Sequence, residues 1–154
     1  INLLKKNFRV RLIIIGKGKK KRILQNFILN NNLQDRVRLF GYLKNPYNYI
    51  KNSDIVISTS IFEGLPNILL ESQYLKKYII STNCQTGPKE ILLNGEAGDL
   101  ITIGDYKKLS FLIKNYYKRK KIIKKKISIG TKNFHRFDYK FNCNKYLKFI
   151  SSNE

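Results

Sequence analysis

The chain has 154 residues, 42% of them hydrophobic, which is enough apolar material for the core of one globular domain. Its two cysteines, Cys84 and Cys143, are too few and too far apart for a disulfide scaffold or a zinc site, which favours a reducing, cytosolic setting. The sequence contains no run of about 18 apolar residues, which argues against a membrane-spanning helix.

The formal net charge of +21 is concentrated at the two ends of the chain. Between residues 35 and 105, seven Lys and Arg stand against eight Asp and Glu, and the flanks hold the other basic residues. Basic ends suit contact with an anionic surface, either lipid headgroups or nucleic acid. The alternative is that the lysines only decorate solvated helices.

The first elements in chain order alternate short strands with helices. Three apolar runs predict buried strands, over residues 9–15, 37–41 and 54–59. Apolar residues at helical spacing predict helices between these strands, over residues 19–33 and 46–52.

The second half continues this alternation. A helix is expected from Pro66 to about Leu75, because proline is favoured at a first helical position. The elements expected after it are a strand over 78–82, a short helix over 89–93, a strand over 98–102, a helix capped by Asp105, and Lys-rich helices to the end. The whole pattern predicts an α/β fold, a Rossmann-like parallel sheet with helices on both faces, whose ligands bind beyond the carboxyl ends of the strands.

Two of the ten acidic residues, Glu63 and Glu71, bracket the start of the helix that follows the third strand. Gly64 would let a ligand approach the backbone closely. An anion could be bound by the backbone N–H groups at the helix start, those of Leu65, Asn67 and Ile68. A nucleotide-sugar presents hydroxyls, a diphosphate and hydroxyls in that order. The alternative is that Glu63 only begins a helix and Glu71 is a solvated surface residue.

Between residues 11 and 105, the chain resembles the carboxyl-terminal half of retaining nucleotide-sugar glycosyltransferases with the GT-B architecture, of the group 1 (family 4) kind. Glu63 and Glu71 match the family signature of two glutamates separated by seven residues. The matching segments are RLIIIGKG, VRLFGYLKN, DIVISTSIFEGLPNILLES, YIISTNCQTGPKEIL and GEAGDLITIGD. The resemblance implies one nucleotide-sugar-binding domain over residues 1–154, with a Lys-rich helical tail over 106–154.

The resemblance also implies roles for individual residues. Glu63 would be the catalytic residue, contacting the donor sugar and setting its pose. The donor-binding residues would be Glu63, Gly64, Leu65, Pro66, Asn67, Ile68 and Glu71, and the base would be bordered by Gly41, Tyr42 and Leu43. In this set the backbone of Asn67 and Ile68 would bind the diphosphate, and Glu71 would bind the ribose. The TGPKE loop over 86–90 would be mostly structural, with Gly87 fixing its turn.

The family's chemistry implies an enzyme of the hexosyltransferase type that acts in polysaccharide biosynthesis. It would transfer a sugar from a UDP- or GDP-sugar to a glycan or lipid-linked acceptor with retention at the anomeric carbon. Oriented backbone donors would stabilise the departing diphosphate, so no metal and no other cofactor are expected. We expect a cytoplasmic protein, peripheral on the inner face of the membrane.

The chain also departs from the family pattern. The resemblance includes neither the family's amino-terminal domain, which binds the acceptor, nor the first strand of the carboxyl-terminal half, and we expect both to be absent from this sequence. The sequence has no Met and opens on INLLKKN, so we expect a fragment. The isolated chain is therefore expected to bind donor weakly and to transfer sugar slowly or not at all.

Two other functions remain open from the sequence. The chain could be a basic α/β module that binds nucleic acid, although the resemblance argues against nucleic acid as a partner, or it could be a non-catalytic truncated remnant of a glycosyltransferase. The segment Lys118–Lys126 could be a solvated helix, or it could lie on an anionic membrane, since Ile122 and Ile123 interrupt its charges.

Overall fold

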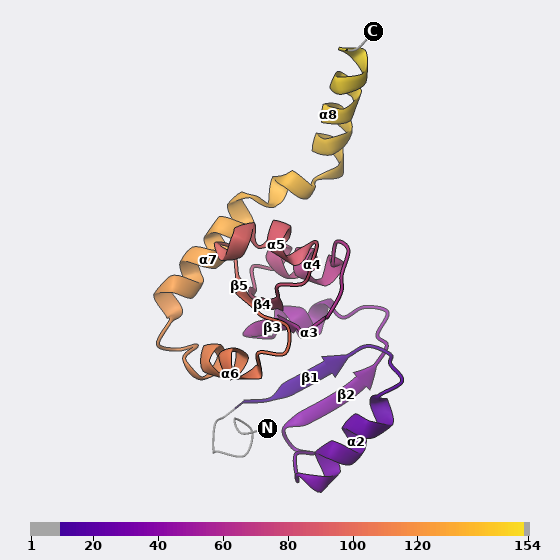
Figure 1. Ribbon diagram of the computed structural model, residues 1–154, viewed down its shortest axis with the longest axis vertical. Helices are drawn as coiled ribbons and strands as arrows, with labels where there is room; N and C mark the ends of the chain where they lie inside the picture. Colours follow the sequence, from indigo (N-terminus) through magenta and orange to yellow (C-terminus); the bar gives the residue numbers. More distant parts are fainter. Residues whose placement is uncertain (1–9, 153–154) are drawn as a thin grey trace. The chain divides into compact units, whose positions relative to one another are not determined.

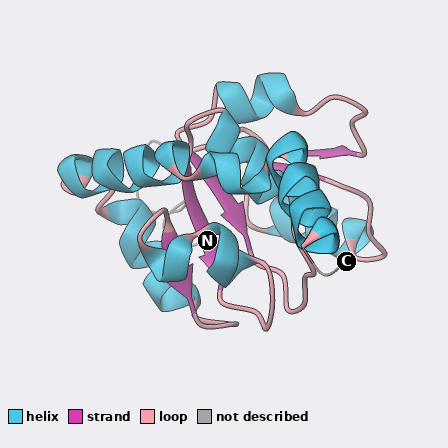
Figure 2. Cartoon of the chain, turned by 90° about the horizontal axis from the view of Figure 1, so that it is seen from above, coloured by secondary structure: helices cyan, strands magenta, loops and turns pink. Residues whose placement is uncertain are grey.

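A computed structural model describes residues 10–152, which form two compact units. The boundary between the units in the sequence falls between Asn48 and Tyr49. Hydrogen bonding joins the strands into two parallel sheets, one in each unit. Helices flank the strands (Figure 1, Figure 2), so the predicted α/β fold class is confirmed. The sequence prediction of one nucleotide-sugar-binding domain stays a prediction.

The first unit contains two strands and the helix that connects them. Strand β1 (Leu12–Ile15) pairs in parallel with β2 (Val37–Gly41), and helix α2 (Lys21–Asn30) lies between them in the chain. The predicted bounds of the second strand are confirmed at both ends. The first strand begins at Leu12, and the Arg9 end of its predicted range lies outside the described residues.

The second unit is built around the sheet order β3-β4-β5. After α3 (Tyr47–Lys51), which begins before the division between the units, the elements are β3 (Ile55–Ser58), α4 (Asn67–Tyr74), β4 (Tyr78–Thr82), α5 (Pro88–Ile91), η1 (Leu93–Gly95), β5 (Asp99–Ile101), α6 (Tyr106–Lys114), α7 (Lys120–Lys132), η2 (Phe134–Phe137) and α8 (Tyr139–Ser151). All five residues of β4 are buried, because this strand has a neighbour on each edge and helices over both faces.

Side chains on the two faces of β4 enter different apolar clusters, because successive residues of a strand point in opposite directions. Tyr78 and Ile80 pack with Ile101 of β5 and with residues of α6 and α7. Ile79, on the other face, packs with Leu69 of α4 and with residues at and just after α5. The sheet of the second unit is therefore covered on both sides.

The helix ends depend on local capping. Asp105 caps α6 as predicted, since its carboxylate accepts a hydrogen bond of 2.8 Å from the backbone N–H of Lys108. The prediction that Pro66 is the first helical residue is wrong by one position. Pro66 has extended backbone angles, φ −70° and ψ 107°, and acts as the N-cap, so α4 begins at Asn67.

The Lys-rich helix α7 packs against the core of the second unit through Ile123. Ile123 is 3% exposed and packs on β4 and β5, whereas its neighbour Ile122 is 51% exposed. A membrane contact made through both isoleucines is therefore wrong for this structure, because Ile123 is already buried within the protein.

Ile123 and Ile122 offer a matched pair of substitutions. Ile123→Ala is expected to lower the free energy of unfolding by about 3 kcal/mol, because it leaves a cavity in the core. Ile122→Ala, with the same chemical change at an exposed position, is expected to change it by less than about 0.5 kcal/mol. Urea unfolding followed by circular dichroism measures both values, and equal losses would contradict the packing of α7.

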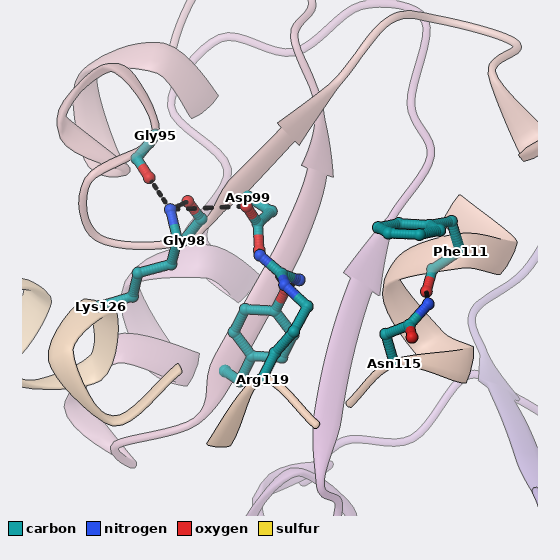
Figure 3. A network of polar contacts seen from close by, with 8 residues as sticks. Gly95, Gly98, Asp99, Phe111, Asn115, Arg119 and Lys126 are labelled. Atoms are coloured by element: carbon teal, nitrogen blue, oxygen red, sulfur yellow. Dashed lines mark hydrogen bonds and ion pairs between the residues drawn. The ribbon is translucent and has the colours of Figure 1, made fainter. Parts of the chain in front are cut away.

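An ion network lies at the amino-terminal ends of β4 and β5, the opposite end of this parallel sheet from the loop that carries Glu63. Figure 3 shows the side chains of Lys126 and Arg119 pointing toward Asp99. Asp99 pairs with Arg119 at 3.0 Å and with Lys126 of α7 at 3.4 Å. The Tyr78 hydroxyl donates to Asp99 and accepts a bond of 3.0 Å from Arg119. Lys126 also donates to the carbonyl oxygens of Gly95 and, at 2.9 Å, Gly98. Two of the tail's basic residues thus fasten α7 to the sheet.

The network shifts the pKa values of its members. Burial alone would raise the pKa of Asp99, but the hydrogen bond from Tyr78 and the charges of Lys126 and Arg119 outweigh it, so the pKa is lowered. Burial, followed by the hydrogen bond to Asp99, raises the pKa of Tyr78. A lowered carboxyl pKa adds stability above the unfolded value of about 3.9, and this stability is lost as the pH falls through the folded value.

Asp99→Asn is accordingly expected to lower the free energy of unfolding by about 2 kcal/mol at pH 7, because two cations lose their charged partner. The difference from the unaltered protein should shrink as the pH falls below about 4, because the unfolded carboxyl is protonated there first and the native carboxylate only at its lowered pKa. Urea unfolding at pH 7, 5 and 3 measures this. Asp35→Asn is the control, since Asp35 is exposed, and a pH-independent difference for Asp99→Asn would contradict the assignment.

Helix α8 stands apart from these packed elements, because every side chain between Tyr139 and Ser151 is exposed. Asp138 caps the helix by accepting a hydrogen bond of 2.8 Å from the backbone N–H of Phe141. Neither α8 nor any other helix within residues 10–152 combines the length and the apolar character that crossing a bilayer requires.

Candidate functional site

Glu63 lies in the loop between the carboxyl end of β3 and the start of α4, where the sequence predicts it. Its side chain is half-buried, and its carboxylate oxygen Oε1 accepts a hydrogen bond of 2.5 Å from the Ser60 hydroxyl. Its backbone carbonyl accepts a hydrogen bond from the Thr86 hydroxyl. Both the side chain and the backbone of Glu63 are therefore held by neighbouring hydroxyl groups.

The loop after β4 packs directly on the Glu63 loop. Thr82, the last residue of β4, donates from its hydroxyl to the Ser60 carbonyl at 2.5 Å. We call Ser60, Thr82 and Thr86 the hydroxyl brace. Gly87 has a φ of +74°, and a Cβ placed there would be 1.9 Å from the Gly64 carbonyl oxygen, so only glycine allows the two loops to approach this closely.

The start of α4 follows the Glu63 loop without a break. Asn67 and Ile68 are its first two residues, and N–H groups in a first helical turn have no partner within the helix. Glu71 is four residues after Asn67, so both side chains lie on the same helix face, while Leu69 is buried on another face. Neither Glu63 nor Glu71 is buried.

Other expected donor-binding residues complete this segment. A Cβ built at Gly64 would meet nothing within 4 Å, so its backbone is open to a ligand. Leu65 is 49% exposed, whereas Pro66 is buried as the N-cap of α4. The second unit thus brings together, in one short stretch, the seven residues that were expected to bind donor, which are Glu63, Gly64, Leu65, Pro66, Asn67, Ile68 and Glu71.

The expected base-binding residues belong to the first unit. Gly41 ends β2 with a φ of +71°, and Leu43 follows it half-buried. Tyr42 is 64% exposed, and the Lys17 ammonium lies 5.2 Å from the centroid of its ring. These residues form an exposed corner beyond the carboxyl end of a parallel strand, as the sequence predicts for a binding rim.

A shallow hollow of about 450 Å³ lies beside the loop that follows β4. Its lining includes Thr86 and Gly87, the basic residues Lys89 and Arg136, and the acidic Glu90. Within residues 10–152, no group of three or more His, Cys, Asp or Glu side chains is placed to hold a metal ion. The expectation of a reaction without metal stays a prediction.

Sequence reasoning did not single out Ser60 or Thr82. The signal that could have found them is the run of hydroxyl residues at the carboxyl ends of two neighbouring strands, ISTS across the end of β3 and IST at the end of β4. Because parallel strands end at the same edge of the sheet, a hydroxyl at the end of one strand can reach the loop after its neighbour, as the Thr82 hydroxyl reaches the Ser60 carbonyl.

The sequence of the chain matches a known protein family. The family model described as "Glycosyl transferases group 1" matches residues 1–133. The chain belongs to the group 1 glycosyltransferases. The match extends on both sides of the 11–105 range expected from the motifs, so the family pattern includes α6 and α7.

Sequence relatives of this group 1 glycosyltransferase chain are much longer than the chain itself. It is 28% identical, over 90% of its length and 39% of the relative's, to an N-acetylgalactosamine-N,N'-diacetylbacillosaminyl-diphospho-undecaprenol 4-alpha-N-acetylgalactosaminyltransferase of Campylobacter jejuni. It is 46% identical over 82 residues to an uncharacterised glycosyltransferase of Methanocaldococcus jannaschii, which is 53% of this chain and 20% of that protein. The chain thus spans only part of each relative.

Solved structures give the same result for the fold. HepE of Anabaena, in complex with UDP, matches with a TM-score of 0.81 and 20% identity, over 93% of this chain and 41% of HepE. TarM matches with a TM-score of 0.82 and 22% identity, over 96% of this chain and 30% of TarM. This likeness confirms the expected fold, that of a domain of GT-B glycosyltransferases.

Proposed function

We propose that this chain is the donor-binding part of a retaining, family 4 member of the group 1 glycosyltransferases, and that its donor is a UDP- or GDP-sugar. One observation carries the proposal. The carboxylate of Glu63 is held beside the start of α4, and Glu71 lies one turn further along the helix, on the face of Asn67. HepE, whose structures contain UDP and UDP-glucose, supports this class of ligand for the fold.

Each part of the site has a role in the proposed reaction. Glu63 binds hydroxyls of the donor sugar and sets its pose, and the backbone N–H groups of Asn67 and Ile68 bind the diphosphate. Glu71 accepts hydrogen bonds from the ribose hydroxyls, and the corner at Tyr42, with Gly41 and Leu43, borders the base. As the bond to the sugar breaks, negative charge develops on the diphosphate, and the oriented N–H groups stabilise it without a metal.

The acceptor in this proposal is a glycan or a lipid-linked acceptor, and its binding site lies on an amino-terminal domain. The Campylobacter relative supports a lipid-linked acceptor, because its name specifies a diphospho-undecaprenol. Exposed lysines on α7, among them Lys121 and Lys124, would allow contact with the anionic inner face of a membrane. Because the chain spans only 41% of HepE, we expect the isolated chain to transfer sugar slowly or not at all.

The proposal is tested by calorimetric titration of the 154-residue chain with UDP, GDP, UDP-glucose, UDP-N-acetylglucosamine and GDP-mannose. We expect one nucleotide series to bind and its sugar form to bind differently from the free diphosphate. A parallel titration with single-stranded DNA over a salt series tests the nucleic-acid alternative. Strongly salt-dependent DNA binding together with no binding of any nucleotide would reject the proposed function.

A further inference from the structure

The hydrogen bond between Ser60 and Glu63 fixes a carboxylate that would otherwise rotate freely. The Ser60 hydroxyl donates to Oε1 of Glu63 at 2.5 Å, a short bond of the kind that charged acceptors form. Among residues 10–152, no hydrogen-bond partner meets the second oxygen, Oε2. One oxygen is therefore held by the protein and the other is left for a ligand.

The position of Ser60 is itself determined by the sheet. Its backbone carbonyl accepts the bond of 2.5 Å from Thr82, a residue that is 2% exposed and belongs to the central strand β4. The Thr86 hydroxyl donates to the backbone carbonyl of Glu63. The hydroxyl brace thus connects the carboxylate to a rigid element of the core, which limits its movement before a ligand binds.

From this geometry we propose that Ser60 is a positioning residue, which orients the Glu63 carboxylate so that Oε2 can bind a hydroxyl of the donor sugar. The inference rests on the proposed function and adds a residue to it. Ser60 touches no ligand in this arrangement and acts only through Glu63. Its effect is therefore confined to the sugar part of the donor, because the diphosphate and ribose are bound by the start of α4 and by Glu71.

Because Ser60 is expected to affect only the sugar part of the donor, the experiment compares the affinity for a nucleotide-sugar with the affinity for the free nucleotide. The probes are the nucleotide-sugar that binds most tightly in the UDP- and GDP-sugar panel, and the matching free UDP or GDP. Ser60→Ala is expected to weaken nucleotide-sugar binding about tenfold, because the carboxylate loses its orienting bond, and to leave free nucleotide binding within about twofold. Ser60→Thr keeps the hydroxyl and is expected to restore most of the nucleotide-sugar affinity.

Ser53→Ala is the matched control. Its hydroxyl also donates one hydrogen bond, of 2.8 Å to the Ile50 carbonyl, but it has no contact with Glu63. It should leave both affinities unchanged, and thermal unfolding of each variant identifies any loss of fold. Equal weakening of both probes by Ser60→Ala, or no rescue by Ser60→Thr, would overturn this inference alone. Failure of the unaltered chain to bind any nucleotide would overturn the proposed function and the inference together.

Discussion

Replacing Glu71 by alanine is expected to weaken the binding of both the free nucleotide and the nucleotide-sugar about a hundredfold, or ~3 kcal/mol. The reason is that Glu71 is proposed to bind the ribose, which both ligands contain. Calorimetric titration of the variant measures both affinities. Glu63→Gln should behave differently and weaken only the nucleotide-sugar, because Glu63 is proposed to contact the sugar.

The control for this experiment is Glu96→Ala. Glu96 is exposed and follows η1, so its replacement removes the same charge without altering α4. Any attachment to nucleic acid should be unchanged in all three variants, because one charge is small against a net +21. Unaltered nucleotide affinity in Glu71→Ala would show that this glutamate is only a surface residue of the helix.

The second large effect is expected from Gly87→Ala. The new methyl group would lie 1.9 Å from the Gly64 carbonyl oxygen and 2.6 Å from Cδ of Pro66, at a φ of +74° that disfavours any side chain. The two loops must separate to relieve these contacts, so we expect the free energy of unfolding to fall by about 3 kcal/mol or more. Urea unfolding measures the loss.

Gly64→Ala is the matched substitution on the facing loop. A Cβ at Gly64 meets nothing within 4 Å, so we expect its stability to stay within about 1 kcal/mol of the unaltered protein. Its nucleotide-sugar affinity should nevertheless fall, because the methyl group covers backbone that the donor is proposed to approach. Similar stability losses in the two variants would contradict the close packing of the loops at Gly87.

The parts of the fold that the sequence predicts well are those whose burial is visible in the pattern. Strand β4 is apolar until its Ser-Thr end and is central in the sheet, and its predicted bounds, Tyr78 and Thr82, are both confirmed. The start of α4 was misplaced by one residue. Proline fits both the N-cap and the first helical position, and the ψ angle that distinguishes them depends on the packed loop around Pro66.

The contacts that sequence reasoning missed all depend on tertiary structure. Arg119 and Lys126 belong to a run of basic residues that suggests a solvated or membrane-bound helix, and nothing local indicates that both reach Asp99. In the same way, Thr86 lies 23 positions after Glu63, and only the parallel order of β3 and β4 brings the two loops together. The Glu63 to Glu71 segment could be predicted because all its residues lie in one stretch of chain.

The hydroxyl brace has a consequence for the construction of hybrid glycosyltransferases. The Glu63 loop is held by Thr82 at the end of β4 and by Thr86 and Gly87 in the loop that follows, so each of the two segments depends on the other for its position. If the segment that corresponds to EGLPN were taken from a homologue alone, its glutamate would pack against a β4 end and a following loop from a different protein. Donor preference should therefore be transferable between relatives only when both segments are exchanged at once.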